Sequence, residues 1–459
     1  MDTIAAISTA RFAAAGVGML RISGDDAVSV AEKVVRRPGG KGLADAESRK
    51  MVRCSLLDTT GAVIDDILAV VFRAPGSYTG EDVVELHCHG APIVLEEALR
   101  ALFQAGARQA QAGEFTKRAF LNGHMDLTQA EAVVDLIDAE TAEEARNAAG
   151  QLNGMLTRMV EQVYERLMDI TSRFYAVVDY PDEDIEPLQQ QEIESTLARS
   201  EDTLRRLLST AERGRILKKG VSAAIVGRPN VGKSSLLNAL LGFERAIVTD
   251  IAGTTRDTVE EKVLCGGVLL RLMDTAGIRD TADTVEKIGV ERSCRAMEQA
   301  ELVLAVLDGS VPFTEEDREI LQKASRCKKW VLVRSKADLD SAPVPMMEFS
   351  GEHHAPSAVV ELSSVTGEGL GELEAAVAAL FPNTGAAPGA VLTNARQTEA
   401  VGRALEAVSS AKQALEAGLT PDAILTDAED ALHALGELLG KTVSEDLVST
   451  IFSRFCVGK

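Results

Sequence analysis

One junction constrains the fold of this chain more than any other: an apolar strand that runs into a glycine-rich loop and then a helix. "SAAIVG" leads into "GRPNVGKSS", which matches G-x-x-x-x-G-K-S from Gly227 to Ser234, and the helical "LLNALLG" follows. Backbone N–H groups of such a loop bind phosphate, Lys233 adds a positive charge, and the Ser234 hydroxyl can ligate Mg²⁺. Up to about Leu380 short apolar strands alternate with helical segments, which predicts an α/β P-loop domain with a parallel sheet.

Two motifs downstream indicate that the loop binds a guanine nucleotide. In "DTAG", Asp274 ends a strand and is expected to hold Mg²⁺ through water, while the Gly277 N–H can reach the γ-phosphate. In "SKAD", after the strand "WVLV", the Asp338 carboxylate can accept two hydrogen bonds from guanine, and Lys336 can lie over the base. The order of these motifs is typical of a Ras-like GTPase and favours GTP over ATP.

The predicted nucleotide site draws on two further segments. "GTTRD" supplies a threonine for the magnesium shell, so we assign Mg²⁺ to Ser234 and Thr255, and "LSS" supplies serines near the base edge. The residues predicted to bind GTP are Asn230, Val231, Gly232, Lys233, Ser234, Ser235, Thr249, Asp250, Ile251, Ala252, Gly253, Thr254, Thr255, Asp274, Thr275, Ala276, Gly277, Ser335, Lys336, Ala337, Asp338, Ser363 and Ser364.

Two positions depart from the Ras-like pattern. Ile278 follows Gly277 where Ras has a glutamine that orients the attacking water, and an isoleucine cannot hold a water. Ser335 stands where an asparagine amide usually ties the base loop to the P-loop. Because its hydroxyl is shorter and has fewer donors, we expect guanine selectivity to persist through Asp338 with weaker affinity.

Length and composition are those of a multidomain cytoplasmic protein. The 459 residues indicate about three domains, and 46% hydrophobic residues are enough for ordinary cores. A net charge of −22 argues against non-specific coating of nucleic acid, so an RNA partner must meet a local basic patch or be presented by another protein. The six cysteines form no C-x-x-C pair, no apolar run is long enough to span a bilayer, and the start lacks the basic region of a signal peptide.

Periodicity predicts two kinds of structure around the P-loop domain. "MVRCSLL", "AVIDDILAVVFRA" and "DVVELHCHG" are strand-like, and "APIVLEEALRALFQAG" is typical of a helix that ends at a glycine, so we expect an N-terminal α+β domain. Apolar residues then recur at spacings of four and three, as in a bundle seam or an intermolecular coiled coil. They are Leu156, Val160, Val163, Leu167, Ile170 and Phe174.

Helices on both sides of the P-loop domain point to a discontinuous helical domain. After the linker "FPNTGAAPGAVLT" the chain is Ala- and Leu-rich. We therefore expect an all-α domain built from both flanks, with the α/β domain inserted into it. The predicted segments are residues 1–119, 120–217, 218–381 and 382–459.

Over nearly its whole length the chain resembles the MnmE (TrmE) family of tRNA-modification GTPases. The most specific segments lie outside the P-loop domain: "DTIAAIST", "GVGMLRISG", "YTGEDVVELHCHG", "GEFTKRAFLNG" followed by "DLTQAEAV", and the terminal "FCVGK". The resemblance implies a homodimer whose N-terminal domain binds a tetrahydrofolate derivative (5-formyl- or methylene-tetrahydrofolate). It also implies a FAD-dependent partner of the GidA/MnmG type, in a heterotetramer that installs an aminomethyl or carboxymethylaminomethyl group on C5 of the wobble uridine (position 34) of certain tRNAs.

The resemblance also implies roles for single residues. The folate contacts would be Arg21, Glu85, His124, which stands where the family has a long basic residue, and Lys459. The terminal "RFCVGK" is expected to run toward the N-terminal domain of the dimer partner. Hydrolysis would require K⁺ and Glu286, which orients the water in place of the missing glutamine. The K⁺ ligands would be Asn230, Thr249, Ile251 and Thr254.

Several residues also have plainer interpretations. Arg21 and Glu85 can be ordinary surface residues of a strand, and Cys456 can be a packed thiol rather than a chemically used one. His87 and His89 lie two apart on a strand, so they share a face and can bind a metal only with a third ligand. "RRLLSTAERGRILKKG" can touch tRNA or form a solvated helix with a basic end.

Two other functions are compatible with the same P-loop domain. One is a nucleotide-gated RNA-binding or ribosome-assembly GTPase that modifies nothing, although the acidic flanks show no KH-type G-x-x-G segment between helices. The other is a folate-dependent one-carbon transferase in which the GTPase domain is regulatory. Wobble-uridine modification, which the resemblance implies, is the first hypothesis.

Overall fold

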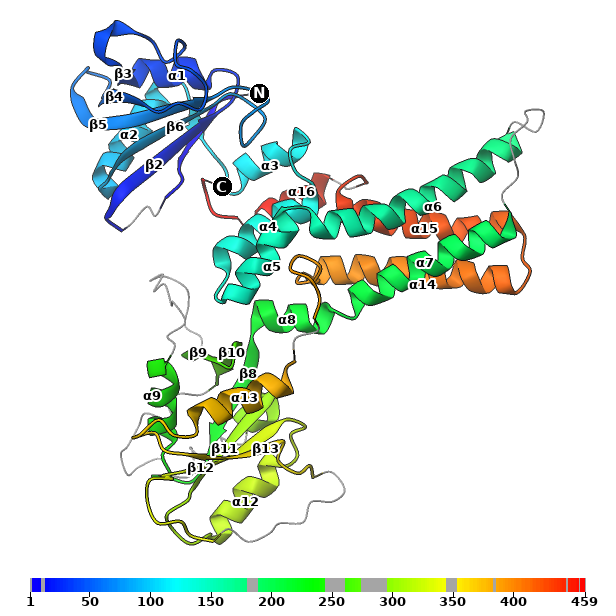
Figure 1. The fold of residues 1–459 in the computed structure, drawn as a ribbon. Coiled ribbons are helices and arrows are strands. Elements are labelled where there is room, and N and C mark those ends of the chain that lie inside the picture. Colours follow the sequence, from blue (N-terminus) through cyan, green and yellow to red (C-terminus); the bar gives the residue numbers. More distant parts are fainter. Residues whose placement is uncertain are drawn as a thin grey trace. The chain divides into compact units, whose positions relative to one another are not determined.

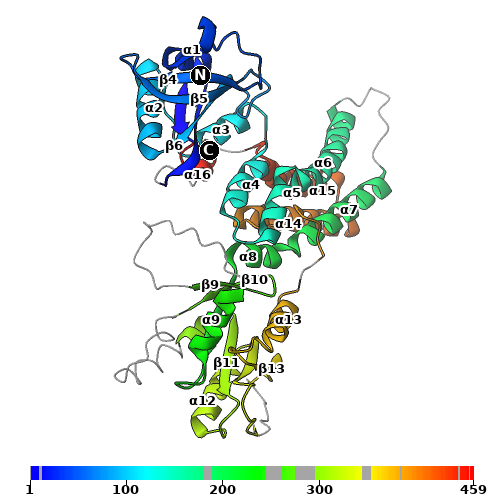
Figure 2. The same cartoon turned by 60° about the vertical axis from the view of Figure 1, so that its left-hand side comes forward.

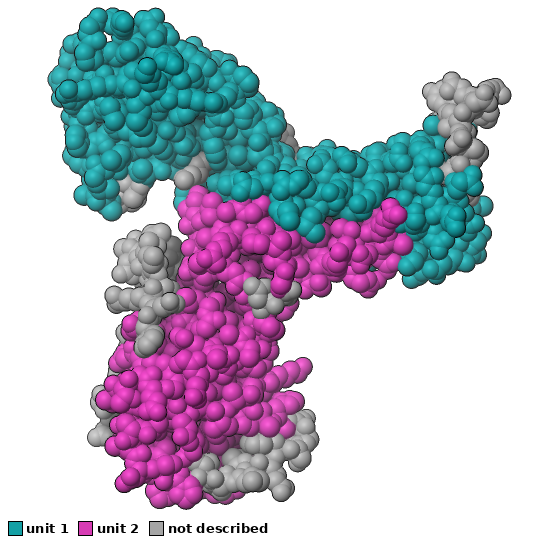
Figure 3. Space-filling model, viewed as in Figure 1, with its two compact units in different colours: residues 1–134, 152–197, 406–459 teal, residues 135–151, 198–405 magenta. Residues whose placement is uncertain are grey.

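The computed structural model describes residues 2–9, 13–179, 189–243, 261–273, 295–343, 353–382, 385–442, 445–453 and 455–458. The chain forms two compact units, residues 1–134, 152–197 and 406–459 in one and residues 135–151 and 198–405 in the other (Figure 3). The boundaries of the four sequence segments stay a prediction. None of the described helices has the length and apolar character needed to cross a membrane.

An α+β domain forms the N-terminal part of the first unit (Figure 1). Its sheet has the order β3-β4-β5-β6-β2-β1-β7, and every neighbouring pair is antiparallel except β1 and β7. The elements are β1 (Ile4–Ile7), β2 (Ala15–Ser23), α1 (Ala27–Val34), β3 (Val35–Arg36), η1 (Pro38–Gly40), β4 (Val52–Leu57), β5 (Val63–Phe72), β6 (Val83–Gly90), α2 (Pro92–Ala105) and β7 (Arg108–Gln109).

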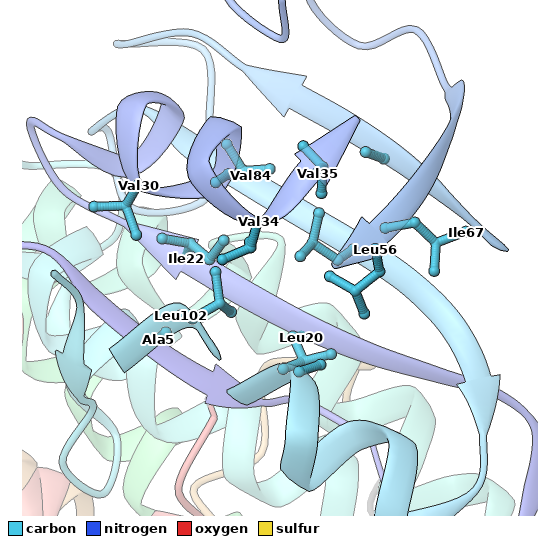
Figure 4. Packing of buried hydrophobic residues seen from close by; sticks show 14 of the residues in the cluster. Ala5, Leu20, Ile22, Val30, Val34, Val35, Leu56, Ile67, Val84 and Leu102 are labelled. Atoms are coloured by element: carbon cyan, nitrogen blue, oxygen red, sulfur yellow. The ribbon is translucent and has the colours of Figure 1, made fainter. Parts of the chain in front are cut away.

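Side chains alternate along these strands, so one face of the sheet is buried in a hydrophobic core, and we call the opposite face, which carries Arg21 and Glu85, the site face. Leu20 and Ile22 of β2 pack with Val84 of β6 and with residues of α1 and α2, as Figure 4 shows. Because successive side chains point to opposite faces of a sheet, the intervening Arg21 and Glu85 lie on the other face. The predicted strands and the predicted helix at α2 are confirmed.

A helical domain is built from segments before and after the P-loop domain, as predicted. The heptad seam lies on α6, where Leu156, Val160 and Val163 are fully buried, and α6 packs against α15 of the same chain. The seam is therefore part of a bundle core. The helices are α3 (Glu114–Leu121), α4 (Leu127–Asp138), α5 (Ala142–Leu152), α6 (Met155–Asp179), α7 (Gln190–Leu208), α8 (Ala211–Lys219), α14 (Ala395–Glu416), α15 (Pro421–Leu439) and α16 (Glu445–Phe452).

The inserted domain is a twisted α/β sheet, seen from two directions in Figures 1 and 2. Its strand order is β13-β12-β11-β8-β10-β9, parallel except for the β9–β10 pair. Helices α9 and α13 pack in the core of one face and α12 in that of the other. The elements are β8 (Val221–Val226), α9 (Lys233–Phe243), β9 (Glu261–Cys265), β10 (Val268–Leu272), β11 (Leu302–Asp308), α12 (Glu315–Ala324), β12 (Trp330–Ser335), β13 (Ala358–Leu362) and α13 (Leu370–Leu380).

Candidate functional site

The glycine-rich loop joins β8 to α9. Asn230 has a φ of 62° and Gly232 one of 100°, so the loop turns through the left-handed region twice. A Cβ atom on Gly227 would lie 2.4 Å from the carbonyl oxygen of Val306 on β11, so only glycine lets the loop pass this close to the sheet. Helix α9 begins at Lys233, so its free N–H groups and the positive end of its dipole lie at the loop.

Lys233 lies within this loop. Its Nζ atom donates to the carbonyl oxygens of Gly227 and Arg228, each at 2.7 Å. Burial lowers the pKa of Lys233 below its usual value, because desolvation disfavours the charged form. A phosphate beside the ammonium group would favour the charged form, so the lysine suits an anionic ligand.

Ser335 ties the base loop to the P-loop. Its hydroxyl contacts the carbonyl oxygens of Val231, in the P-loop, and of Leu307, on β11, where the distance is 3.0 Å. The residue is only 3% exposed. The single hydroxyl hydrogen serves both carbonyls in turn. The serine thus makes the P-loop contact for which an asparagine is usual, while its effect on affinity stays a prediction.

The other candidate base-binding residues lie at the carboxyl ends of β12 and β13. The hydroxyl of Ser363 donates to Oδ1 of Asp338 at 2.6 Å, which fixes the orientation of that carboxylate. Lys336 has a φ of 60°, and its ammonium group pairs with Asp308 at the end of β11. The half-buried Ser364 follows Ser363. The structure thus brings the "SKAD" and "LSS" segments together.

Arg21 and Glu85 form an ion pair on the site face of the N-terminal sheet. They lie opposite each other on β2 and β6, with 2.9 Å between Arg21 Nη2 and Glu85 Oε1. The Arg21 guanidinium also lies 5.0 Å from the ring centre of Tyr78 and 5.8 Å from that of Phe115. The carboxylate and the half-buried Tyr78 ring can bind a flat polar heterocycle by hydrogen bonds and stacking, while the fully buried Phe115 ring supports Arg21.

His124 lies beside the loop of residues 78–80, which also carries Tyr78, the ring next to Arg21. A Cβ atom on Gly80 would lie 2.9 Å from the His124 ring, and Gly80 is two residues from Tyr78 in the sequence. Asn122 supports the arrangement, since its Nδ2 donates to the carbonyl oxygen of Thr79 at 2.7 Å. The segment of residues 78–80 therefore connects Arg21 with His124.

The C-terminal tail contacts the N-terminal domain of its own chain, and the expected contact with a dimer partner stays a prediction. Val457 forms an antiparallel bridge with Ala112, and Ser8 Oγ donates to the carbonyl oxygen of Gly458 at 3.0 Å. The tail reaches this position because it leaves α16, which packs beside α3 at the edge of that domain. Lys459 lies outside the described residues.

The remaining candidates show no metal-binding arrangement. Cys456 is exposed. His89 Nδ1 lies 2.7 Å from Asp65 Oδ1, and this contact raises the pKa of His89, while His87 Nε2 lies 3.5 Å from Glu85 Oε2. Within the described ranges, no group of three or more His, Cys, Asp or Glu side chains could hold a metal ion.

Two family models and curated proteins match this chain over nearly all of its length. A family model described as the MnmE helical domain matches residues 127–456, and one described as the GTP-binding protein TrmE N-terminus matches residues 3–124. A tRNA modification GTPase MnmE from Symbiobacterium thermophilum is 45% identical over 460 residues, all of this chain and 99% of that protein. MnmE proteins from Roseiflexus sp. and Clostridioides difficile are 43% and 40% identical, again over all of this chain and 99% of theirs.

The chain belongs to the MnmE family of tRNA modification GTPases. Its fold class is the one predicted: an α+β N-terminal domain, a discontinuous helical domain and an inserted P-loop GTPase domain. Two groups of candidates lie outside the described residues, so their placement stays a prediction. They are the segment Thr249, Asp250, Ile251, Ala252, Gly253, Thr254 and Thr255, and the segment Asp274, Thr275, Ala276, Gly277 with Ile278 and Glu286.

Two aspartates that fix the nucleotide-binding loops were not predicted from the sequence. Asp308 pairs with Lys336, and Asp317 pairs with Arg228 of the P-loop. The role of Asp308 could have been predicted from the sequence. Asp308 ends an apolar strand, the strand beside it leads into "SKAD", and parallel strands end at the same sheet edge. Nothing local in the sequence pairs Asp317 with the P-loop.

Proposed function

We propose that this member of the MnmE family hydrolyses GTP in order to modify C5 of the wobble uridine, position 34, of certain tRNAs. The group added is aminomethyl or carboxymethylaminomethyl. The chain acts in the cytoplasm as a homodimer, in a heterotetramer with a FAD-dependent partner of the GidA/MnmG type. Full-length similarity to MnmE proteins supports the tRNA substrate, and the hydrogen bond that joins the base loop to the P-loop is the observation that carries the GTP part.

Each nucleotide-binding residue has a distinct task. Lys233 and the N–H groups at the start of α9 bind the phosphates, and Asp338, oriented by Ser363, accepts the hydrogen bonds of guanine. Ser234, in the first turn of α9, and Thr255 hold Mg²⁺, which when bound neutralises charge that develops on the phosphates.

We also propose that K⁺ binds beside the P-loop and that Glu286 orients the attacking water. The position of Asn230 supports this, because this exposed amide residue lies in the P-loop itself, two residues before Gly232. Thr249, Ile251 and Thr254 complete the set of K⁺ ligands. A cation there supplies the positive charge that an arginine finger supplies in other GTPases.

The one-carbon donor is a tetrahydrofolate derivative bound on the site face of the N-terminal sheet. The Glu85 carboxylate would accept hydrogen bonds from the pterin edge, Arg21 would orient that carboxylate, and we assign His124 and Lys459 to the acidic tail of the folate. The ion pair between Arg21 and Glu85, beside Tyr78 and Phe115, supports this assignment. The bound folate supplies the carbon that becomes the new substituent.

The decisive experiment measures the mass of the wobble nucleoside in tRNA. A bacterial strain that lacks its MnmE gene is complemented with this chain or with its Asp338→Asn variant. Modified nucleoside should return with the wild-type chain and not with the variant, because the variant loses guanine recognition. A nucleoside spectrum that stays the same with and without the wild-type chain would refute the proposal and favour a GTPase that modifies nothing.

A further inference from the structure

A P-loop residue outside the nucleotide-binding set is fixed to a helix on the other side of the sheet. Arg228, the residue after the first glycine of "GRPNVGKS", donates from Nε to Oδ1 of Asp317 at 2.6 Å. Its side chain is 20% exposed, and that of Asp317 is 3% exposed. A charged hydrogen bond to a carboxylate this well buried is stronger than a surface ion pair and is screened less by salt.

The carboxylate of Asp317 is itself held in place. Asp317 is the third residue of α12, and its second oxygen, Oδ2, accepts from the backbone N–H of Thr314 at 3.0 Å and from its hydroxyl at 2.8 Å. The Asp317 backbone N–H in turn donates to the Thr314 hydroxyl oxygen at 3.4 Å, and this bond together with the one from the Thr314 N–H forms a capping box at the start of the helix. One oxygen therefore caps α12 while the other holds Arg228, so the arginine is attached to a rigid element.

Arg228 links this anchor directly to the phosphate-binding lysine. The backbone carbonyl of Arg228 is one of the two that accept from Lys233 Nζ, at 2.7 Å. Arg228 is therefore held at two places, its side chain by Asp317 and its carbonyl oxygen by Lys233. Ser335 holds the loop at Val231, three residues further on. The loop between these two points includes Asn230, a non-glycine residue at positive φ, which must be kept in that conformation.

We propose that Asp317 and Arg228 are positioning residues for the phosphates of GTP: their ion pair keeps the P-loop in the conformation that binds them. A loop already fixed in its binding conformation loses less conformational entropy when the ligand binds. The anchor comes from α12, which contributes none of the predicted nucleotide-binding residues. This inference rests on the proposed function, since it presupposes that the loop binds GTP.

The test separates loop positioning from general support of the fold. Arg228→Met removes the charge and keeps much of the side-chain length, and Arg228→Lys keeps a cation that can reach Asp317. The KM and kcat for GTP, and the Kd for GDP by titration calorimetry, are measured on the full chain. A mispositioned loop raises KM and Kd in every molecule, whereas partial unfolding lowers kcat in proportion to the folded fraction and leaves KM unchanged.

We expect Arg228→Met to raise both KM for GTP and Kd for GDP at least tenfold, with kcat reduced less than threefold. Arg228→Lys should stay within about threefold of wild type in all three. The ratio of the Kd values for GDP and IDP should not change in Arg228→Met, because the base loop is untouched. As the matched control, Asp308→Asn loosens Lys336 in the base loop and should lower that preference for GDP.

Two results would overturn the inference: KM and Kd within twofold of wild type in Arg228→Met, or a loss of kcat alone. If Arg228→Met does not fold, Asp317→Asn takes its place, because an asparagine oxygen can still cap α12 while the charge that holds Arg228 is gone. The same limits then apply to Asp317→Asn. Failure of the wild-type chain to bind GDP or turn over GTP would instead refute the proposed function, and the two failures are thus distinguishable.

Discussion

The hydroxyl of Ser335 joins the base loop to the P-loop, and we expect its removal to weaken nucleotide binding. In Ser335→Ala this bond no longer holds the two loops in their binding arrangement, and holding them so when the nucleotide binds costs about 1 kcal/mol, or roughly a fivefold higher Kd for GDP. The preference for GDP over ADP should remain, because Asp338 is unchanged. Titration calorimetry measures both.

The exposed Ser195 on α7 gives a matched control for this substitution, because its hydroxyl donates only to the backbone of its own helix. Ser195→Ala should leave the Kd for GDP within about 1.5-fold of wild type, since exposed substitutions away from a site have small effects. Equal GDP affinity in wild type and Ser335→Ala would mean that the remaining contacts between the two loops are sufficient without the hydroxyl.

Because Ile278 cannot orient a water, the proposed mechanism of hydrolysis is tested through K⁺ and Glu286. We expect turnover to be slow in Na⁺ and at least about tenfold faster in K⁺, and to fall by a similar factor in Glu286→Ala with GDP binding retained. Ile278→Gln should not rescue that variant, because the proposed mechanism positions the water through Glu286 and not through the residue after Gly277. The same rate in both salts, or full activity of Glu286→Ala, would rule this mechanism out.

At the scale of single elements, helix α5 carries a carboxyl group, that of Glu144, which is buried near other carboxylates. Glu144 is 6% exposed, and burial, together with the like charges of Glu140 and Asp135, raises its pKa to about 7. Its Oε2 accepts from the backbone N–H of Glu140 at 2.8 Å, a bond that a protonated or amide side chain also makes. The folded protein therefore binds a proton here that the unfolded chain releases near its ordinary pKa.

Because the folded state binds this extra proton, the free energy of unfolding decreases as the pH rises. Stability associated with Glu144 is full below pH 4.5, falls as the pH rises toward 7, and is constant above that. Glu144→Gln should remove the fall and raise the free energy of unfolding at pH 8 by about 1 to 3 kcal/mol, with little change at pH 4.5. Thermal unfolding followed by calorimetry at both pH values measures this.

The exposed Glu316 on α12 provides the control for Glu144. Glu316→Gln should shift the unfolding temperature equally little at pH 4.5 and at pH 8, because the side chain of Glu316 is exposed to solvent in the folded protein as well as in the unfolded chain. A Glu144→Gln protein that is no more stable than wild type at pH 8 would show that water or a neighbouring cation already compensates the buried charge.

The elements themselves were predictable because their signals are local. The strands around Val52–Leu57 and Val83–Gly90 alternate apolar and polar residues, and α2 ends at a glycine whose φ is 120°. Pairing between distant segments has no such local signal. The register that places Asp308 opposite Ser335, and the contact between Arg228 and Asp317, 89 residues apart, depend on how the whole sheet assembles.

At the scale of the whole molecule, the last described residue contacts the first strand of the N-terminal domain. Gly458 has a φ of 102°, and a Cβ atom there would lie 2.3 Å from the carbonyl oxygen of Ile7. Gly458→Ala should displace the tail and with it Lys459. We expect the Kd for 5-formyl-tetrahydrofolate, measured by equilibrium dialysis, to rise at least about tenfold, while kcat/KM for GTP stays within twofold of wild type.

Gly418→Ala is the matched control, because Gly418 also has a positive φ, of 72°, but faces open space. It introduces similar backbone strain without touching the N-terminal domain, and folate binding should be unaffected. A parallel loss of folate binding and GTP turnover in Gly458→Ala would mean that the tail supports the fold as a whole.

The contact between Ser8 and Gly458 joins residues 450 positions apart, and this has a consequence for biosynthesis. The N-terminal domain leaves the ribosome long before the tail is added, so the sheet can fold early while its contact with the tail forms only after Val457 and Gly458 have been synthesised. Nascent chains stalled before Val457 should therefore carry a folded N-terminal domain that lacks this contact. An affinity tag fused after Lys459 would extend from the same place, so tags for folate-binding work belong elsewhere on the chain.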